Sequence, residues 1–271
     1  MPSVVFTTWQ GAGRYPLHTP NQSLSDGDHV APAITQANLV QAARANNILA
    51  GLPANEMNQL AAKLKPVPLI FGEVLYRPEE PIDYVYFVTA GIVSLLAVLE
   101  DGSTVEAGLI GAEGMLGIPV VLGATETPNQ ALVQGKGHAL RMSAPDLKSA
   151  LSNGSSLLER SLRYMNYLFL QVAQTAACNR THHVNQRLAC WLLLIHDRMP
   201  GNEFSLTQDL MSRMLGVRRA GVSVAAATLR QAGLVDYQRA KMTISNRRGL
   251  EEAACECYRT VKNQFDRLFI E

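Results

Sequence analysis

The chain has 271 residues, of which 47% are hydrophobic and 17% are charged, a composition that supports compact cores and excludes global disorder. The length favours two modest domains, and the lack of a signal-peptide pattern or a long apolar run predicts a soluble, cytoplasmic protein. The formal net charge is only +1, but residues 1–150 hold eight basic and thirteen acidic side chains, whereas residues 200–248 hold eight basic and three acidic ones.

Residues 1–45 are predicted to form a flexible N-terminal arm. The first part of this segment is rich in Pro, Gly, Ser, Thr and Asn and has no sustained hydrophobic period. Residues 34–50 have a helical composition, and Pro53 begins another short helix that Pro66 and Pro68 would end.

Short β-type runs separated by turn residues follow. Asp101-Gly102 is a strong hairpin signal between two of them. The expected strands are Leu69–Phe71, Val74–Tyr76, Tyr84–Thr89, Gly91–Leu99, Ser103–Leu109, Gln130–Gln134 and Gly137–Met142. Their number and spacing predict an antiparallel β-roll or barrel over residues 46–150. His138 is the only histidine here, and no nucleophile, phosphate-loop or dinucleotide motif occurs, so we expect no enzyme activity.

A helical region is expected from Ala144 to Arg198. Apolar residues within it recur in steps of four and three, which is the spacing of a coiled-coil seam. The seam residues are Leu158, Leu162, Met165, Phe169, Val172 and Ala176. We therefore assign residues 151–179 to a dimerisation helix and expect a homodimer. The alternative is a helix that packs only on its own barrel.

Residues 206–227 carry a helix-turn-helix pattern. Gly216 stands where the chain must leave the first helix, a position that favours left-handed backbone geometry. Ser212 supplies a small side chain where two helices would cross. The shared interior would hold Met211, Leu215, Val217, Val222, Ala225 and Ala226. The alternative is an ordinary helical hairpin with basic residues on a solvated face.

Two short strands, Leu234–Gln238 and Lys241–Ser245, follow around a tight Arg239-Ala240 connection. A basic hairpin directly after a helix-turn-helix is typical of a wing that lies along the phosphate backbone of DNA, and the local excess of basic residues agrees. Residues 180–250 are therefore predicted to form a winged helix-turn-helix domain, with a closing helix over residues 251–271. We expect double-stranded DNA to be contacted by Thr207, Gln208, Arg218, Arg219, Ser223, Arg239 and Lys241.

The four cysteines are Cys178, Cys190, Cys255 and Cys257. Their spacings match no usual zinc or iron–sulfur ligand set, and residues two apart in a helix, as at 255 and 257, point to different faces. The adjacent pair His182-His183 diverges in the same way. We therefore expect reduced structural thiols, no bound metal and no cofactor.

The overall α+β order of an antiparallel β-roll, a long dimerisation helix and a C-terminal winged helix-turn-helix resembles the cyclic-AMP receptor/fumarate–nitrate regulator (Crp/Fnr) family of bacterial transcription factors. The residues that carry the resemblance are Phe71–Leu75, Val85–Gly91, Ile110–Gly117, Leu206-Thr207 and Leu215–Arg219. The resemblance implies a cyclic-nucleotide-binding-like sensory barrel that controls DNA binding by reorienting the C-terminal domains. It also implies a palindromic operator and RNA polymerase as a further partner.

The chain departs from this family in the barrel and in the second helix of the helix-turn-helix, which is the helix expected to contact the bases. Cyclic-nucleotide members hold the phosphate with an arginine-serine pair, whereas the corresponding stretch here contains Asn129 and Gln130. Neither can supply the bidentate cation that offsets desolvation of a cyclic phosphate, so cyclic AMP is not the expected effector, and the effector-binding residues are unassigned.

Ala220 and Val224 replace the acidic residue and the arginine of the common TGTGA-type readers, so we expect a different half-site. The alternative function is a sensory or protein-interaction module whose winged domain binds a protein.

Overall fold

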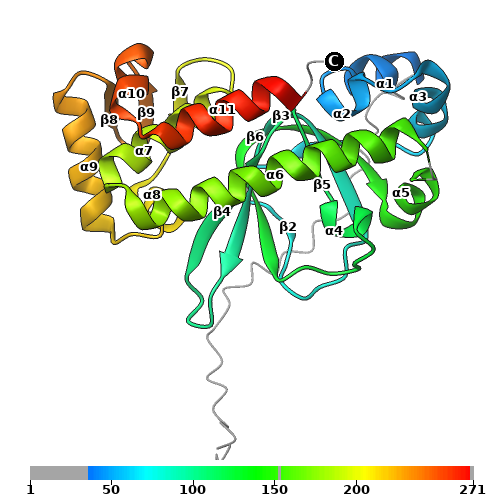
Figure 1. Ribbon diagram of the computed structural model, residues 1–271, viewed down its shortest axis with the longest axis horizontal. Helices are drawn as coiled ribbons and strands as arrows, with labels where there is room; N and C mark the ends of the chain where they lie inside the picture. Colours follow the sequence, from blue (N-terminus) through cyan, green and yellow to red (C-terminus); the bar gives the residue numbers. More distant parts are fainter. Residues whose placement is uncertain (1–35, 152–153, 269–271) are drawn as a thin grey trace, which may run out of the picture. The chain divides into compact units, whose positions relative to one another are not determined.

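The computed structural model describes residues 36–151 and 154–268, and these residues form the expected α+β architecture (Figure 1). An antiparallel sheet is followed by one long helix and then by a winged helix-turn-helix. Residues 1–35, which make up most of the expected arm, and residues 269–271 lie outside the described residues. Within the described ranges, no helix combines the length and the apolar character that a membrane span requires.

Three short helices precede the sheet: α1 (Gln36–Ala43), α2 (Asn47–Ala50) and α3 (Ala54–Ala61). The expected arm is therefore too long, because its last part is helical. Asn46 separates α1 from α2. Its side-chain oxygen accepts hydrogen bonds from the first turn of α2, and its amide donates to the carbonyl oxygens of Val88 at 2.8 Å and Gly114 at 2.7 Å. This fully buried side chain thereby caps a helix and ties it to the sheet.

Six strands form one antiparallel sheet in the order β1-β6-β3-β4, with β2 on β6 and β5 on β3. Their bounds are β1 (Lys65–Leu69), β2 (Val74–Tyr76), β3 (Tyr84–Val98), β4 (Thr104–Ile110), β5 (Met115–Leu116) and β6 (Asn129–Ser143), and helix α4 (Ile118–Val121) lies between β5 and β6. The Asp101-Gly102 turn joins β3 to β4 as expected, with Gly102 at a φ of 79°.

Two pairs of expected strands are single long strands in the structure. β3 and β6 each run for 15 residues and pair with each other through several register shifts. The expected breaks coincide with glycines where the two strands come unusually close. A Cβ on Gly137 would lie 2.0 Å from the carbonyl oxygen of Ala90, and Gly91 has a φ of 91°. The glycines therefore bend the strands instead of ending them.

The expected first strand, Leu69–Phe71, is wrong in position. The strand occupies Lys65–Leu69 and includes Pro66 and Pro68, which we expected only to end a helix. β1 pairs on one side only, with β6, so it is an edge strand. An edge position tolerates proline, because the missing N–H can face away from the neighbouring strand.

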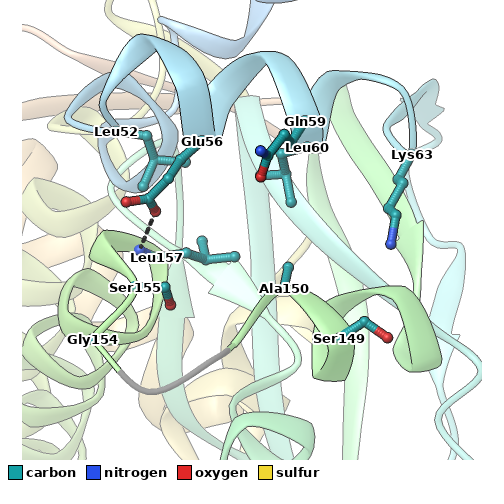
Figure 2. A pocket seen from close by; sticks show the side chains of 10 residues that line it. All are labelled: Leu52, Glu56, Gln59, Leu60, Lys63, Ser149, Ala150, Gly154, Ser155 and Leu157. Carbon is teal, nitrogen blue, oxygen red and sulfur yellow. Dashed lines mark hydrogen bonds between the residues drawn. The ribbon is translucent and has the colours of Figure 1, made fainter.

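The long helical region is broken twice, into α5 (Ala144–Ala150), α6 (Ser156–Thr181) and α7 (Val184–His196). Ser155 caps α6 through a hydrogen bond from the amide of Leu158. Glu56 of α3 adds a carboxylate at the same end, where it accepts hydrogen bonds from the amides of Ser156 and Leu157. Figure 2 shows this contact beside a cavity of about 430 Å³. The helices near the N-terminus are thus fastened to the start of the long helix.

The C-terminal part contains one strand that the sequence pattern does not predict. It also contains two helices in place of the single closing helix that we expected. Its elements are β7 (Glu203–Ser205), α8 (Gln208–Leu215), α9 (Arg219–Gln231), β8 (Val235–Gln238), β9 (Lys241–Ile244), α10 (Arg247–Ala253) and α11 (Glu256–Leu268). The expected single closing helix is therefore wrong: α10 and α11 are separate, and Cys255 lies in the break between them. α11 then packs along α6.

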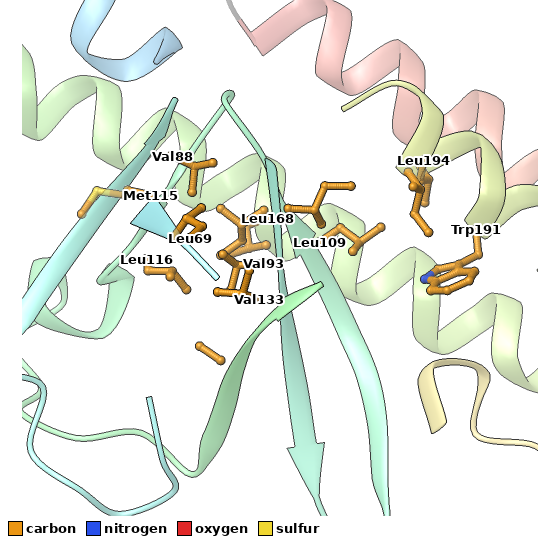
Figure 3. Close-up of a cluster of buried hydrophobic side chains, with 14 of the residues drawn as sticks. Leu69, Val88, Val93, Leu109, Met115, Leu116, Val133, Leu168, Trp191 and Leu194 are labelled. Atoms are coloured by element: carbon orange, nitrogen blue, oxygen red, sulfur yellow. The ribbon is translucent and has the colours of Figure 1, made fainter. Parts of the chain in front are cut away.

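The buried apolar core is continuous from the sheet to the helix-turn-helix domain. Figure 3 shows Val93 and Val133 of the sheet beside Leu168 of α6, with Trp191 of α7 further along. Because the same core includes residues of the sheet, α6 and α7, these three parts pack as one unit.

Candidate nucleic-acid interface

The helix-turn-helix has the local geometry that its sequence predicts. Thr207 caps α8, its hydroxyl accepting a hydrogen bond from the amide of Leu210 at 3.0 Å. Gly216 ends α8 in the left-handed conformation, with φ 60° and ψ 39°. The hydroxyl of Ser212 donates to the carbonyl oxygen of Val217 at 2.5 Å and holds the turn.

The interior of the pair is as expected for most of its members. Five of the residues assigned to it are buried, and Val217 is partly buried and packs against them. The buried five are Met211, Leu215, Val222, Ala225 and Ala226. The register of α9 is therefore fixed by its apolar stripe, and that stripe determines which residues face solvent.

The start of α9 presents basic residues to solvent. Arg218, Arg219 and Ala220 are exposed, and Val224 further along has 68% of its surface exposed. Ser223 is partly buried, and its hydroxyl donates to the carbonyl oxygen of Arg219 at 3.1 Å. The Nε atom of Arg219 donates to Gln208 Oε1 at 3.3 Å, so the first residue of α8 helps to position the arginine.

The wing is a three-stranded sheet in the order β7-β9-β8. Arg239 and Ala240 form its tight turn with φ values of 50° and 63°, the signs of a type I′ turn. Lys241 next to this turn is exposed, and its Nζ lies 2.5 Å from Glu203 Oε2. β7 therefore contributes an acid that partly neutralises one of the expected DNA contacts.

Ion pairing divides the eight basic residues of positions 200–248 into two groups. Five of them pair with a carboxylate of the same segment, of α10 or of Asp197 at the end of α7: these are Arg213, Arg230, Lys241, Arg247 and Arg248. Among the residues that the structure describes, no carboxylate pairs with the three that remain. These are Arg218, Arg219 and Arg239. The uncompensated positive charge is thus concentrated at the start of α9 and at the tip of the wing.

The seam residues of α6 lie outside its buried face. The helix buries Leu157, Tyr164 and Leu168, among others, against the rest of the chain. Phe169 is 69% exposed and Leu162 is 42% exposed, and Ala176 is also exposed. The remaining seam residues, Leu158, Met165 and Val172, are partly buried.

An apolar cavity of about 260 Å³ lies between the sheet and α6. Met165, Phe169 and Val172 of the seam form part of its wall. Tyr76, Thr127 and Asn129 are the lining residues with polar side-chain groups, and no charged side chain lines the cavity among the described residues. The Asn129 position that we compared with the phosphate-binding arginine therefore does lie at a cavity.

Two buried polar contacts join the sheet to α7 and the segment that follows it. Trp191 Nε1 of α7 donates to Glu106 Oε1 of β4 at 2.7 Å. Arg198 Nε donates to Glu113 Oε1 at 2.8 Å, and Arg198 Nη2 donates to the hydroxyl of Tyr167 on α6 at 2.8 Å. Both side chains of the ion pair are almost completely buried, with 3% and 2% exposed.

The helix-turn-helix itself also touches the sheet. A Cβ built on Gly216 would lie 3.0 Å from Cγ2 of Val105 on β4, so the turn between α8 and α9 rests on the strand that carries Glu106. The sheet thus contacts the reading domain at its turn as well as through α7.

Two family models match the chain, and together they cover more than half of it. The Crp-like helix-turn-helix domain matches residues 186–253, and the cyclic nucleotide-binding domain matches residues 71–153. The chain belongs to the Crp/Fnr family of transcriptional regulators. A sequence comparison with curated proteins finds no significant match.

Solved structures of Crp/Fnr regulators share the fold. A putative transcriptional regulator of the family from Eubacterium rectale ATCC 33656 has a TM-score of 0.63 at 15% identity, over 78% of this chain and 98% of its own. FixK2 from Bradyrhizobium japonicum has a TM-score of 0.57 at 19% identity, over 71% and 98%. The c-di-GMP-responsive regulator CLP of Xanthomonas campestris also scores 0.57, at 15% identity over 71% and 99%.

We expect the burial of Glu106 to make stability depend on pH. Burial raises the pKa of Glu106 from its ordinary 4.5 to about 7, although Ser94, Trp191 and Arg198 each favour the charged form. The folded state then binds a proton more tightly than the unfolded state, so the unfolding free energy falls as pH rises from 4.5 to about 7 and is level above that.

Glu106→Gln keeps an acceptor for Trp191 but carries no charge, so it should lose this dependence. Between pH ~5.5 and ~8, the regulator should lose about 2 kcal/mol more than the variant in urea unfolding. Equal pH slopes in the two proteins would contradict the assignment.

Proposed function

We propose that this Crp/Fnr regulator is a homodimer that binds a palindromic DNA operator, with α9 in the major groove and the wing on the phosphate backbone. The observation that carries the proposal is the position of Arg218, Arg219 and Arg239, the exposed cations of residues 200–248 without an acidic partner among the described residues. Uncompensated guanidinium groups on an exposed helix start and a wing tip suit guanine edges and phosphates.

The turn of the wing supports its role. Arg239 occupies a left-handed position at which Gly or Asn is usual, a conformation that costs a side-chain-bearing residue about 1–2 kcal/mol. A long cation at the tip of the wing gains contact with a phosphate from this placement. Gln208, which accepts a hydrogen bond from Arg219, and the exposed Thr207 before it complete the proposed DNA-binding surface. RNA polymerase is a further partner wherever an operator adjoins a promoter.

The effector of the barrel is, in this proposal, a small and largely apolar molecule and not cyclic AMP. The cavity between the sheet and α6 offers apolar walls with Tyr76, Thr127 and Asn129 as the residues that carry polar groups. Lys136 and Arg141 of β6 do not line it. A cyclic phosphate placed there would lose its hydration without gaining a cation. A ligand in this cavity would contact Met165 and Phe169, and these belong to the proposed dimer seam.

Replacement of Arg219 should reveal base reading. We expect Arg219→Ala to weaken operator binding by about 1–3 kcal/mol per half-site and to relax specificity at one base pair. Arg239→Ala is the matched control, because loss of a phosphate contact should weaken binding to all DNA sequences equally. It should also reduce, by about one, the slope of the logarithm of the binding constant against the logarithm of the salt concentration. Lys241→Ala should do the same more weakly, because Glu203 already neutralises it.

These effects can be measured by titrating the variants against a panel of single-base operator variants at several salt concentrations. A uniform loss for Arg219→Ala across the panel would show that Arg219 does not read sequence. Binding that is insensitive to salt would instead point to a protein partner for the winged domain.

Charges placed in the seam should separate the subunits. Met165→Glu combined with Phe169→Glu should give a monomer, because like charges facing each other in an apolar interface cost several kcal/mol. Asn166→Glu is the control, since Asn166 is exposed on the same helix and lines the groove toward α11. Sedimentation velocity measures the result. A doubly substituted protein that still sediments as a dimer would remove this helix from the interface.

The cavity predicts how the protein responds to nucleotides. Calorimetric titration of the full-length regulator with cyclic AMP or cyclic GMP should show no binding, because no cation lines the cavity among the described residues. The same preparation must bind operator DNA, so that the protein is known to be folded. Stoichiometric binding in the low-micromolar range would mean that backbone amides or Lys136 hold the phosphate.

A further inference from the structure

We propose that Cys178, His182, Cys255 and Cys257 form a tetrahedral zinc site that clasps the C-terminal helix α11 to the end of α6. The ligand atoms of these four residues all lie within 4.8 Å of one another. Three thiolates and one imidazole are a usual donor set for a closed structural zinc site. This site does not depend on DNA binding or on any effector of the barrel.

The spacing of the donors fits a single ion. Zinc–sulfur bonds of about 2.3 Å in a tetrahedron place two thiolates about 3.8 Å apart. Cys178 Sγ lies 3.5 Å from Cys255 Sγ, and Cys257 Sγ lies 3.5 Å from His182 Nδ1. The four donors are therefore already at about the separation that coordination requires, and their shared neighbourhood is too small for a polynuclear cluster.

The backbone explains how the donors converge. Cys178 lies in the last turn of α6 and His182 directly follows the helix, but the backbone N–H of His182 still donates to the carbonyl oxygen of Cys178 at 3.1 Å, which keeps the two residues one turn apart. Cys255 lies in the break before α11, and Cys257 lies in its first turn. The helical argument that separates residues 255 and 257 therefore does not apply, because Cys255 is outside the helix. Both thiols can reach the end of α6.

The surroundings of the four donors have the features of an outer ligand shell. His182 Nε2 lies 3.2 Å from Glu256 Oε1, an arrangement that orients Nδ1 toward the thiols, although the hydroxyl of Thr181 also lies 3.3 Å from Nδ1. Gln174 Nε2 donates to Cys257 Sγ at 3.1 Å. Such contacts fix the ring and the thiolate in the directions that a metal needs.

Charge is also matched. A zinc ion with three thiolates carries a net charge of −1. The guanidinium of Arg187 lies close enough to interact with Cys178 and Cys255, and it donates to the carbonyl oxygen of Leu215 at the end of α8. Arg187 would therefore offset the charge of the metal and its thiolates, leaving the exposed Glu256 carboxylate as the outer negative charge, and the site would adjoin the helix-turn-helix through one arginine.

Metal content tests the proposal directly. The full-length protein, purified under reducing conditions without chelator, should contain about one zinc ion per chain. Cobalt substitution should give the intense visible bands of a tetrahedral thiolate site. Cys178→Ser, Cys257→Ser and His182→Ala should lose the metal and melt at a lower temperature. Cys190→Ser should retain it, although Cys190 also lies against Cys178.

The outer contact gives a second test that does not depend on removing a ligand. Glu256→Gln should keep the stoichiometry but weaken zinc affinity about 10- to 100-fold, measured by competition with a chelating dye. Glu252→Gln is the matched control, because that carboxylate pairs with Arg248. Equal affinities in these two variants would overturn the role given to Glu256 in orienting His182.

Three results would overturn the proposal. The first is a protein that binds no zinc or binds it no more tightly than Cys178→Ser does. The second is a Cys178–Cys255 disulfide in the protein as isolated from cells. The third is loss of metal in Cys190→Ser with retention in His182→Ala, which would make the site an all-cysteine one.

Discussion

The burial of Arg198 is the constraint on which the arrangement of the parts depends. A guanidinium with 3% of its side chain exposed cannot shed its proton, so it needs a carboxylate and further acceptors in fixed places. Burial is the largest influence and by itself would lower the pKa of Arg198, but the charges of Glu113 and Tyr167 and the hydrogen bonds to both together raise that pKa above its ordinary value. Glu113 lies in the turn before β5 and Tyr167 on α6, so one side chain fixes the sheet, the long helix and the end of α7 together.

Features that depend on neighbours in sequence could be predicted well. The left-handed Gly216 and the Asp101-Gly102 hairpin follow from the backbone preferences of a few adjacent residues. The tight connection at Arg239-Ala240 follows from the strand patterns on both sides of it. The exposed start of α9 follows from the apolar period of the same helix. The direct DNA-binding candidates therefore came from the sequence, although their roles in binding are still proposals.

Features that depend on distant partners could not be predicted in this way. The bends at Gly91 and Gly137 exist because β3 and β6 approach each other there, and turn-like glycines within a strand look the same as strand ends. Glu113 and Arg198 are 85 residues apart, and Cys178 and Cys255 are 77 apart. A spacing rule for metal ligands or ion pairs considers only short intervals, so it does not detect side chains that two helix ends bring together.

The long helix α6 is where these local and distant features meet. Its buried face packs against the sheet, Met165 and Phe169 border the apolar cavity, and its last turn carries Cys178 near α11. A molecule that filled the cavity would push on side chains that also belong to the proposed seam, because a packed wall cannot yield without moving its neighbours. The turn at Gly216 rests on Val105, and Trp191 is bonded to Glu106 of the same strand. A shift of β4 or α6 would therefore be transmitted to the helix-turn-helix by two contacts, one at the turn before α9 and one through α7. Two packed arrangements of these contacts, one with the cavity filled and one without, are what control of DNA binding by the barrel requires.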